Sequence, residues 1–147
     1  MKITLITLAQ YAAIAEGNKL VIAGTIDQLE VQRVGGGPIT EKMPIGLPPF
    51  FIAVSAHCSI AEGTEHVMQL MIRDQDGNPV LPEPIALGTW TLRINKYGRP
   101  MRHNQVIAVN GLALPGPGDY TFELQDNGQP TEGGETPLYI VDTTPEQ

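Results

Sequence analysis

Short runs in which apolar and polar residues alternate recur along the chain, separated by Gly, Pro, Asn and Asp. In residues 119–125 the apolar side chains of Tyr120, Phe122 and Leu124 alternate with polar ones. A period of two places every second side chain on the same face of a β-strand. The pattern predicts eight or nine half-buried strands. We expect one at the N-terminus and others at residues 19–28, 50–59, 65–73, 89–94, 105–112, 119–125 and 138–141.

The spacing of these runs indicates one all-β domain over residues 1–147. The sequence has no heptad repeat and no run of about 18 apolar residues that would span a membrane. Many short strands with frequent turn residues are typical of an antiparallel β-sandwich, of immunoglobulin-like or jelly-roll style. In such a fold we expect Trp90, Leu92 and Ile94 to face the core, with Trp90 as its largest side chain.

The first 17 residues resemble a secretory signal, because an apolar stretch ends in an Ala-Ile-Ala triplet. Thr4, Thr7 and Gln10 interrupt that stretch, and its alternation is typical of a strand. We therefore expect a first strand in a cytoplasmic or virion-bound protein, and secretion is the less favoured alternative.

Turn and strand-edge motifs are similar to those of a known group of proteins. They are RDQDGNPV at residues 73–80, LPGPGDYTFEL at residues 114–124, and the pattern over residues 8–24. In these motifs the chain resembles a family of small uncharacterised bacterial and phage β-sandwich proteins, classed as a domain of unknown function. The resemblance implies a compact β-sandwich and supplies no catalytic residue.

One turn contains a set of oxygen ligands spaced as in a calcium loop. Asp74, Asp76 and Asn78 match positions 1, 3 and 5 of an EF-hand. Pro79 stands where that loop needs glycine, and Ile85 stands where it needs a bidentate glutamate. We expect an ordinary turn here, with a non-EF calcium site as the alternative.

Histidine and cysteine residues offer two further candidates for chemistry. His57, Cys58 and His66 flank the connection at residues 59–64, where zinc would need ligands that converge on one point. A strand sends His57 and Cys58 to opposite faces, so we expect two surface histidines and a buried, unreactive thiol. Because Cys58 lies on the apolar face of its strand, we also do not expect it to act as a nucleophile with His103 or His66 as the base. We predict no catalytic residue, metal or cofactor.

Charge is distributed unevenly along the chain, whose formal net charge is −7. All nine Lys and Arg residues lie within residues 1–102, and residues 103–147 carry seven acidic residues and no basic one. This acidic balance argues against nucleic acid as a partner. Four basic residues surround one tyrosine, and we take this group as the candidate interface. It comprises Arg93, Lys96, Tyr97, Arg99 and Arg102.

Two hypotheses about function follow. The first is a non-enzymatic structural or interaction protein, a subunit of a larger assembly such as a phage or virion accessory (decoration-type) protein. Its basic and acidic regions would then favour a homo-oligomer or an assembly partner, with neither nucleic acid nor membrane involved. The alternative is a soluble monomeric module that binds a small ligand, a sugar or a peptide.

Overall fold

The computed structural model describes residues 1–32, 44–57, 64–93, 97, 99 and 102–143, and within them the chain forms eleven strands and no helix. The all-β prediction is confirmed, whereas the expected number of eight or nine strands is too small. The strands are β1 (Lys2–Ala15), β2 (Lys19–Ile26), β3 (Gln28–Val31), β4 (Ile45–Gly46), β5 (Phe50–His57), β6 (Glu65–Arg73), β7 (Ile85–Thr91), β8 (His103–Val109), β9 (Ala113–Leu114), β10 (Gly118–Asp126) and β11 (Gln129–Asp142).

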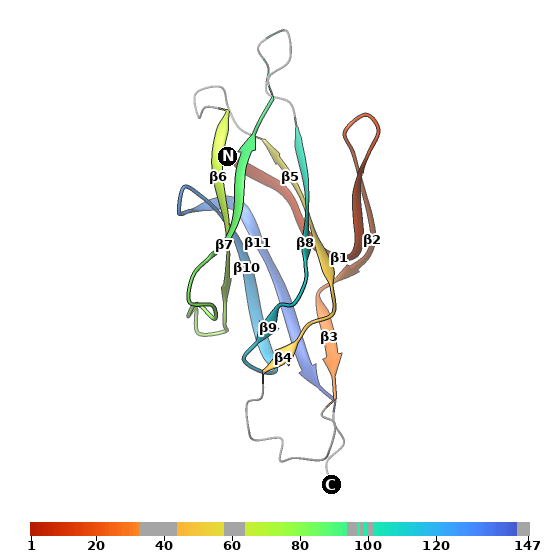
Figure 1. Ribbon diagram of the computed structural model, residues 1–147, viewed down its shortest axis with the longest axis vertical. Coiled ribbons are helices and arrows are strands. Elements are labelled where there is room, and N and C mark those ends of the chain that lie inside the picture. The colour runs from red at the N-terminus through yellow and green to blue at the C-terminus, as the bar shows by residue number, and fades with distance from the viewer. Residues whose placement is uncertain (33–43, 58–63, 94–96, 98, 100–101, 144–147) are drawn as a thin grey trace.

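The strands do not form the two separate sheets expected of a sandwich. Nine of them belong to one sheet in the order β7-β6-β10-β11-β1-β5-β8, with β2 attached to β1 and β3 attached to β11. This sheet curls into a nearly closed barrel in which β7 and β8, the two ends of the path, face each other (Figure 1). The remaining two strands, β4 and β9, pair with each other near one end of the barrel.

Two halves of this sheet meet at a narrow junction. In the first half β1 pairs with β2 and β5, and β5 pairs with β8. In the second half β10 joins β6 to β11, β6 pairs with β7, and β11 pairs with β3. A single parallel pair, Lys2 with Glu132, joins β1 to β11. From this junction the halves diverge and enclose the core.

Side chains of both halves fill the space between them. Phe50 of β5 and Phe122 of β10 meet edge to face, with ring centroids 6.1 Å apart. Trp90 is only 4% exposed and Leu92 only 2%, so the prediction that they face the core is confirmed. Ile94, predicted to join them, lies outside the described residues. Other fully buried side chains are those of Leu8, Ile52, Val54, Met68, Leu70, Ile72, Leu114, Leu124 and Leu138.

The last strand shows where sequence patterns were insufficient. Strand β11 begins at Gln129, whereas the apolar pattern predicted a strand only over residues 138–141. Pro130, Gly133 and Pro137 usually interrupt strands, yet here they lie within a 14-residue strand that pairs with β10 along most of its length. The short strands β3, β4 and β9 were not predicted at all, because two to four residues carry no periodicity.

A buried tyrosine ties the start of β10 to the preceding loop. The hydroxyl of Tyr120 donates a hydrogen bond of 2.6 Å to the carbonyl oxygen of Gly116. The arrangement is similar to the tyrosine corner of immunoglobulin-like domains. Burial raises the pKa of Tyr120 above its ordinary value near 10.

We expect Tyr120→Phe to lower the free energy of unfolding by about 1–2 kcal/mol, because it leaves the Gly116 carbonyl without its partner. The unfolded chain releases the Tyr120 proton near pH 10, whereas the folded protein retains it. The wild-type protein should therefore lose stability as the pH rises above about 10, and the variant should lose less. Urea unfolding at pH 7 and pH 10.5 measures both effects. Tyr139→Phe, at a more exposed tyrosine, is the control, and an equal pH dependence in wild type and Tyr120→Phe would contradict the prediction.

Candidate functional site

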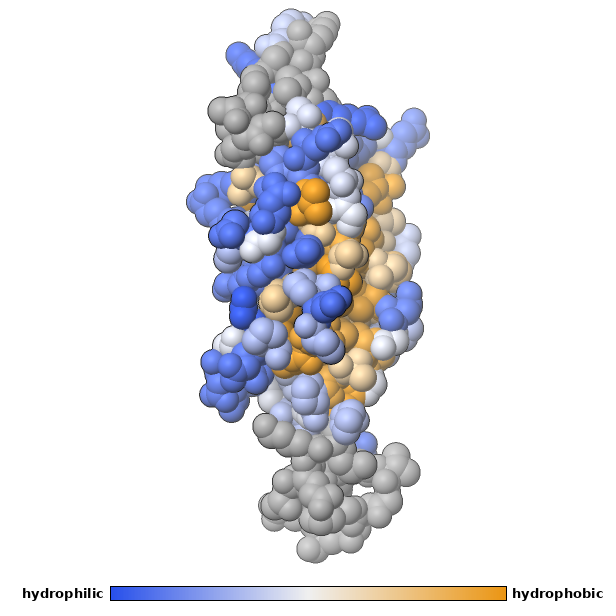
Figure 2. All heavy atoms as spheres, turned by 60° about the vertical axis from the view of Figure 1, so that its left-hand side comes forward, coloured by the Kyte–Doolittle hydropathy of each residue, from blue (hydrophilic) through white to orange (hydrophobic). Residues whose placement is uncertain are grey.

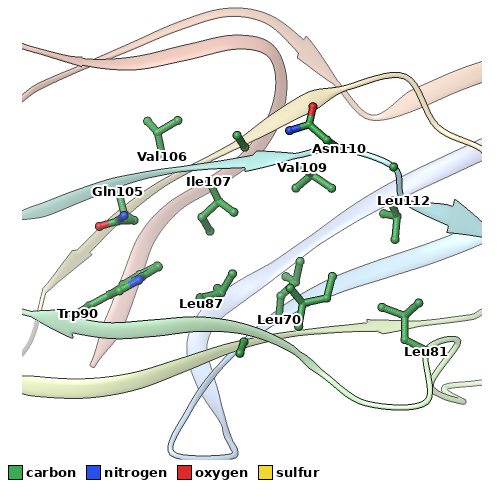
Figure 3. A pocket seen from close by; sticks show the side chains of 14 residues that line it. Leu70, Leu81, Leu87, Trp90, Gln105, Val106, Ile107, Val109, Asn110 and Leu112 are labelled. Carbon is green, nitrogen blue, oxygen red and sulfur yellow. The ribbon is translucent and has the colours of Figure 1, made fainter.

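The barrel is open between β7 and β8, and we call this opening the seam. Among the strands that the structure describes, each of the two has a hydrogen-bonded neighbour on one side only, β6 for β7 and β5 for β8. Most of their facing Cα atoms lie more than 8 Å apart, whereas facing residues of a paired ladder lie about 4.5–5.5 Å apart. A groove of about 580 Å³ occupies the seam (Figure 3).

Apolar side chains line the groove, and none of its 14 lining residues is charged. Ile107 of β8 points across the groove toward Leu87 of β7, and Val109 points toward Leu70 (Figure 3). Leu70, Leu81 and Leu112 complete this apolar surface. On the face drawn in Figure 2, apolar side chains form a strip along the long axis of the molecule, bordered by polar ones. The groove therefore exposes part of the core to solvent.

Proteins normally prevent edge-to-edge pairing with charged side chains, proline and bulges that turn the edge away. At the seam, β7 has a bulge at Leu87, where its register with β6 shifts and the next residue, Gly88, has φ 79°. Strand β8 (HNQVIAV) contains no proline and no Lys, Arg, Asp or Glu, and the same holds for β7 (IALGTWT). A strand normally directs alternate backbone N–H and C=O groups to each side. Outside the bulge of β7, both edges therefore offer main-chain hydrogen-bonding groups toward the groove.

A second, polar pocket of about 370 Å³ lies at the end of the seam where β7 ends and β8 begins, and we call it the end pocket. Below it the rings of Trp90 and His103 meet across the seam, with centroids 5.5 Å apart. Arg93 and Arg102 contribute the two guanidinium groups of the pocket, one from each side. Its other lining residues are Ile14, Asn18, Thr91, His103 and Asn104.

The tip of the β1–β2 hairpin forms one wall of the end pocket and is fixed to β8. Gly17 and Asn18 both have positive φ (79° and 59°), as a tight hairpin turn requires. The Asn18 side-chain amide donates to the carbonyl oxygen of Arg102 at 2.9 Å, and the Asn104 amide donates to the carbonyl oxygen of Asn18 at 2.7 Å. Ser55 in turn donates to the Asn104 side-chain oxygen at 2.7 Å. The wall is thus held by a chain of three hydrogen bonds.

The predicted interface residues divide into two groups in the structure. Arg93 and Arg102 come together in the end pocket. Tyr97, which is 75% exposed, and Arg99 lie on the surface and do not line the pocket. Lys96 lies outside the described residues. Of the described residues in the candidate interface, only Arg93 and Arg102 therefore lie together in one pocket.

The histidine prediction is wrong for His66. This residue is 3% exposed and its Nδ1 lies 2.6 Å from Asp126 Oδ2. The strands that flank residues 59–64, β5 and β6, do not pair with each other, so His57 and His66 are not cross-strand neighbours. His57 instead accepts a hydrogen bond of 3.4 Å from Arg102 Nε. Cys58 lies outside the described residues, so its predicted burial is untested.

The turn considered for calcium uses one of its carboxylates internally. Asp74 Oδ1 accepts hydrogen bonds from the backbone N–H groups of Asp76 and Asn78, both at 2.9 Å. Within the described ranges, no group of three or more His, Cys, Asp or Glu side chains is arranged to hold a metal ion. The structure thus accounts for Asp74 as a turn-forming residue.

The seam itself was not predicted, although one signal was present. Residues 105–112 form a nearly continuous apolar run rather than an alternating one. In the structure, Val106 and Ala108 border the groove together with the inward-pointing Ile107 and Val109. A continuous apolar run is typical of a strand covered on both faces, and here part of that cover is missing.

Fold and site together define a class: an all-β, barrel-like domain with an open, apolar seam between two unpaired strand edges. Residues 4–141 match the model of a family of unknown function (DUF6941), and the chain belongs to that family. The search of curated proteins found no match. In the described part of the chain, no helix has the length and apolar character needed to cross a membrane.

Proposed function

We propose that this protein is a non-enzymatic interaction protein that binds an extended segment of a partner protein as an additional strand in the seam. The observation that carries the proposal is that β7 and β8 face each other across an uncharged groove, each with one unpaired edge. Addition of a strand to an exposed sheet edge is a common mode of peptide recognition.

The separation across the seam exceeds that of a paired ladder, as insertion of a strand requires. Neighbouring strands lie about 4.8 Å apart, so a strand placed between two others separates them by about 9.6 Å. Most facing Cα atoms of β7 and β8 are more than 8 Å apart. Strands of seven residues on each side give a length of about 23 Å. A segment of about five to seven residues would satisfy the free backbone groups on both sides.

The side chains of the groove define the chemistry of the segment. Because none of the lining residues is charged, alternate residues that point inward should be apolar, such as Val, Ile or Leu. Residues that point outward face solvent and can be polar. The partner segment is thus expected to have a period-two pattern like that of the strands it joins.

This proposal retains the expectation that the protein is a subunit of a larger assembly, such as a phage or virion accessory protein. Strand insertion would hold such a subunit on its partner through main-chain hydrogen bonds and apolar contacts. The homo-oligomer expected from the charge distribution stays a prediction, and sedimentation at micromolar concentration tests it.

A small apolar ligand is the second candidate occupant of the seam. The groove volume of about 580 Å³ lies within the range of about 300–1,000 Å³ that is typical of small-molecule sites. Among its described lining residues, the polar side-chain groups are the amides of Gln105 and Asn110 and the indole N–H of Trp90, which leaves few groups to orient such a ligand. We therefore favour the extended segment.

Selection from a library of random 12-residue peptides tests the proposal. We expect the selected peptides to share an alternating apolar pattern and to bind at least about tenfold more weakly to Leu87→Glu, which places a charge in the groove. Val67→Glu is the matched control, because Val67 lies on the adjacent strand β6, is 50% exposed and does not line the groove. Circular dichroism establishes that both variants fold.

Hydrogen exchange provides a test that needs no variant. A bound peptide should slow amide exchange in β7 and β8 and leave β2, which pairs only with β1, unchanged. Peptides that bind Leu87→Glu as well as wild type, or that protect β2 instead, would overturn the proposal. If self-association alone slows exchange in β7 and β8, the occupant of the seam is a second copy of the chain. That result would also overturn the proposal. If no peptide is selected, and small apolar compounds slow amide exchange in β7 and β8, the small apolar ligand becomes the favoured occupant.

A further inference from the structure

The end pocket concentrates positive charge in a protein whose net charge is −7. Arg93 and Arg102 line it together with His103, and none of its described lining residues is acidic. Within the described parts of the chain, no carboxylate lies within ion-pair distance of either arginine. The pocket therefore has the charge and the hydrogen-bond donors to bind an anionic group.

The position of the pocket relates it to the seam. Arg93 lies two residues after the end of β7, and Arg102 immediately precedes β8, so the two arginines flank the same end of the groove. We infer that the end pocket binds a carboxylate at one end of the inserted segment, either an acidic side chain or the C-terminal carboxylate. This inference rests on the proposed function and specifies which segments the seam accepts.

The chemistry of the lining favours a carboxylate on an otherwise apolar segment. Arginine presents a planar set of N–H donors that matches the two oxygens of a carboxylate, and such charge-assisted hydrogen bonds are among the stronger ones in proteins. The groove lacks any charge, whereas its end carries two. A segment with an apolar body and an anionic end is complementary to both parts.

The pocket is also organised before a ligand binds. The hydrogen bonds of Asn18 with Arg102 and Asn104 hold the hairpin tip against β8. The Arg102 side chain is directed to His57, to which its Nε donates at 3.4 Å. Groups that are already held in place lose little conformational freedom on binding, which raises affinity.

The directions of β7 and β8 link the position of the carboxylate to the direction in which the segment is inserted. Strands β7 and β8 run in opposite directions (Figure 1), so an inserted strand is parallel to one and antiparallel to the other. If its C-terminus lies in the end pocket, the segment is antiparallel to β8, and if its N-terminal end lies there, it is antiparallel to β7. The end at which an acidic residue strengthens binding therefore reports the direction of insertion.

Peptides selected on the wild-type protein provide the probe. Each peptide is made with Asp or Asn at its N-terminal end, and with a free or an amidated C-terminus. We expect one acidic form to bind about tenfold more tightly than its neutral counterpart. Arg93→Gln and Arg102→Gln should abolish this preference and leave binding of the neutral peptide unchanged. Arg99→Gln is the matched control, because it removes the same charge from the same basic region outside the pocket.

The outcomes separate this inference from the proposed function. Neutral peptides that bind in the seam, with no preference for either acidic form, would overturn the carboxylate site and leave the proposed function intact. If Arg99→Gln abolishes the preference for the acidic form as fully as Arg93→Gln and Arg102→Gln do, the preference comes from general electrostatic attraction. That result would also overturn the carboxylate site. If neither acidic nor neutral peptides bind the wild-type protein, both proposals fail.

Discussion

Phe122→Ala should lower the free energy of unfolding by about 3–5 kcal/mol, which is a large part of the stability of a domain of this size. The Phe122 side chain has no exposed surface and packs edge to face on Phe50 across the core. Its removal leaves a cavity in the core between the two halves of the sheet, where Phe122 packs on Phe50. Urea or thermal unfolding followed by circular dichroism measures the loss.

Phe51→Ala is the matched control for this substitution. Phe51 neighbours Phe50 in sequence but is only partly buried, and its ring contacts that of Tyr11 at a centroid distance of 6.1 Å. We expect its truncation to cost about 1–2 kcal/mol. An equal cost for both variants would mean that the core does not lie between the two halves as described.

Gly133→Ala should also destabilise the protein strongly, by about 2–4 kcal/mol. Gly133 has φ 74°, which side chains rarely adopt, and a Cβ atom there would collide with the backbone carbonyl oxygen of Ile3. That oxygen belongs to β1 next to Lys2, whose pairing with Glu132 joins the two halves. A methyl group at this position therefore forces the junction apart.

Gly128→Ala separates the effect of backbone conformation from that of crowding. Gly128 has a similar φ of 79°, but an added Cβ would meet no atom within 4 Å. We expect this variant to lose only about 1 kcal/mol. If Gly128→Ala and Gly133→Ala lose equal stability, close contact between β1 and β11 is not what requires glycine at residue 133.

Strands with a clear period of two were the part of the fold that could be predicted. In β6 the apolar residues at alternate positions, Met68, Leu70 and Ile72, are buried. In β10 the expected burial of the apolar face is confirmed, but the polar residues Glu123 and Gln125 between its members are also only 5% exposed. Periodicity reports which face of a strand is buried, so it identified these residues correctly. It does not report which strands are neighbours, and the barrel-like closure depends on that order.

Pairing between distant segments explains what the sequence could not reveal about the site. Strand β5 lies between β1 and β8, which come from opposite sides of it in the chain. The partner of His66 is Asp126, 60 residues away, so local patterns suggested an exposed histidine instead. In the same way, Arg93 and Arg102 were grouped with Arg99 by proximity in sequence, but only the fold selects the first two as a pair.

The pairing of β1 with β11 also has a consequence for how the chain folds. The first and last long strands of the protein meet at Lys2 and Glu132, so the sheet cannot close until almost the whole chain is available. Contacts between residues far apart in sequence slow folding, because the entropy of long loops is lost before the contacts form. During synthesis β1 and β5 can pair early, but the core side of this half stays uncovered until β10 and β11 emerge. Slow folding, with apolar surface exposed along the way, is the expected kinetic result of this topology.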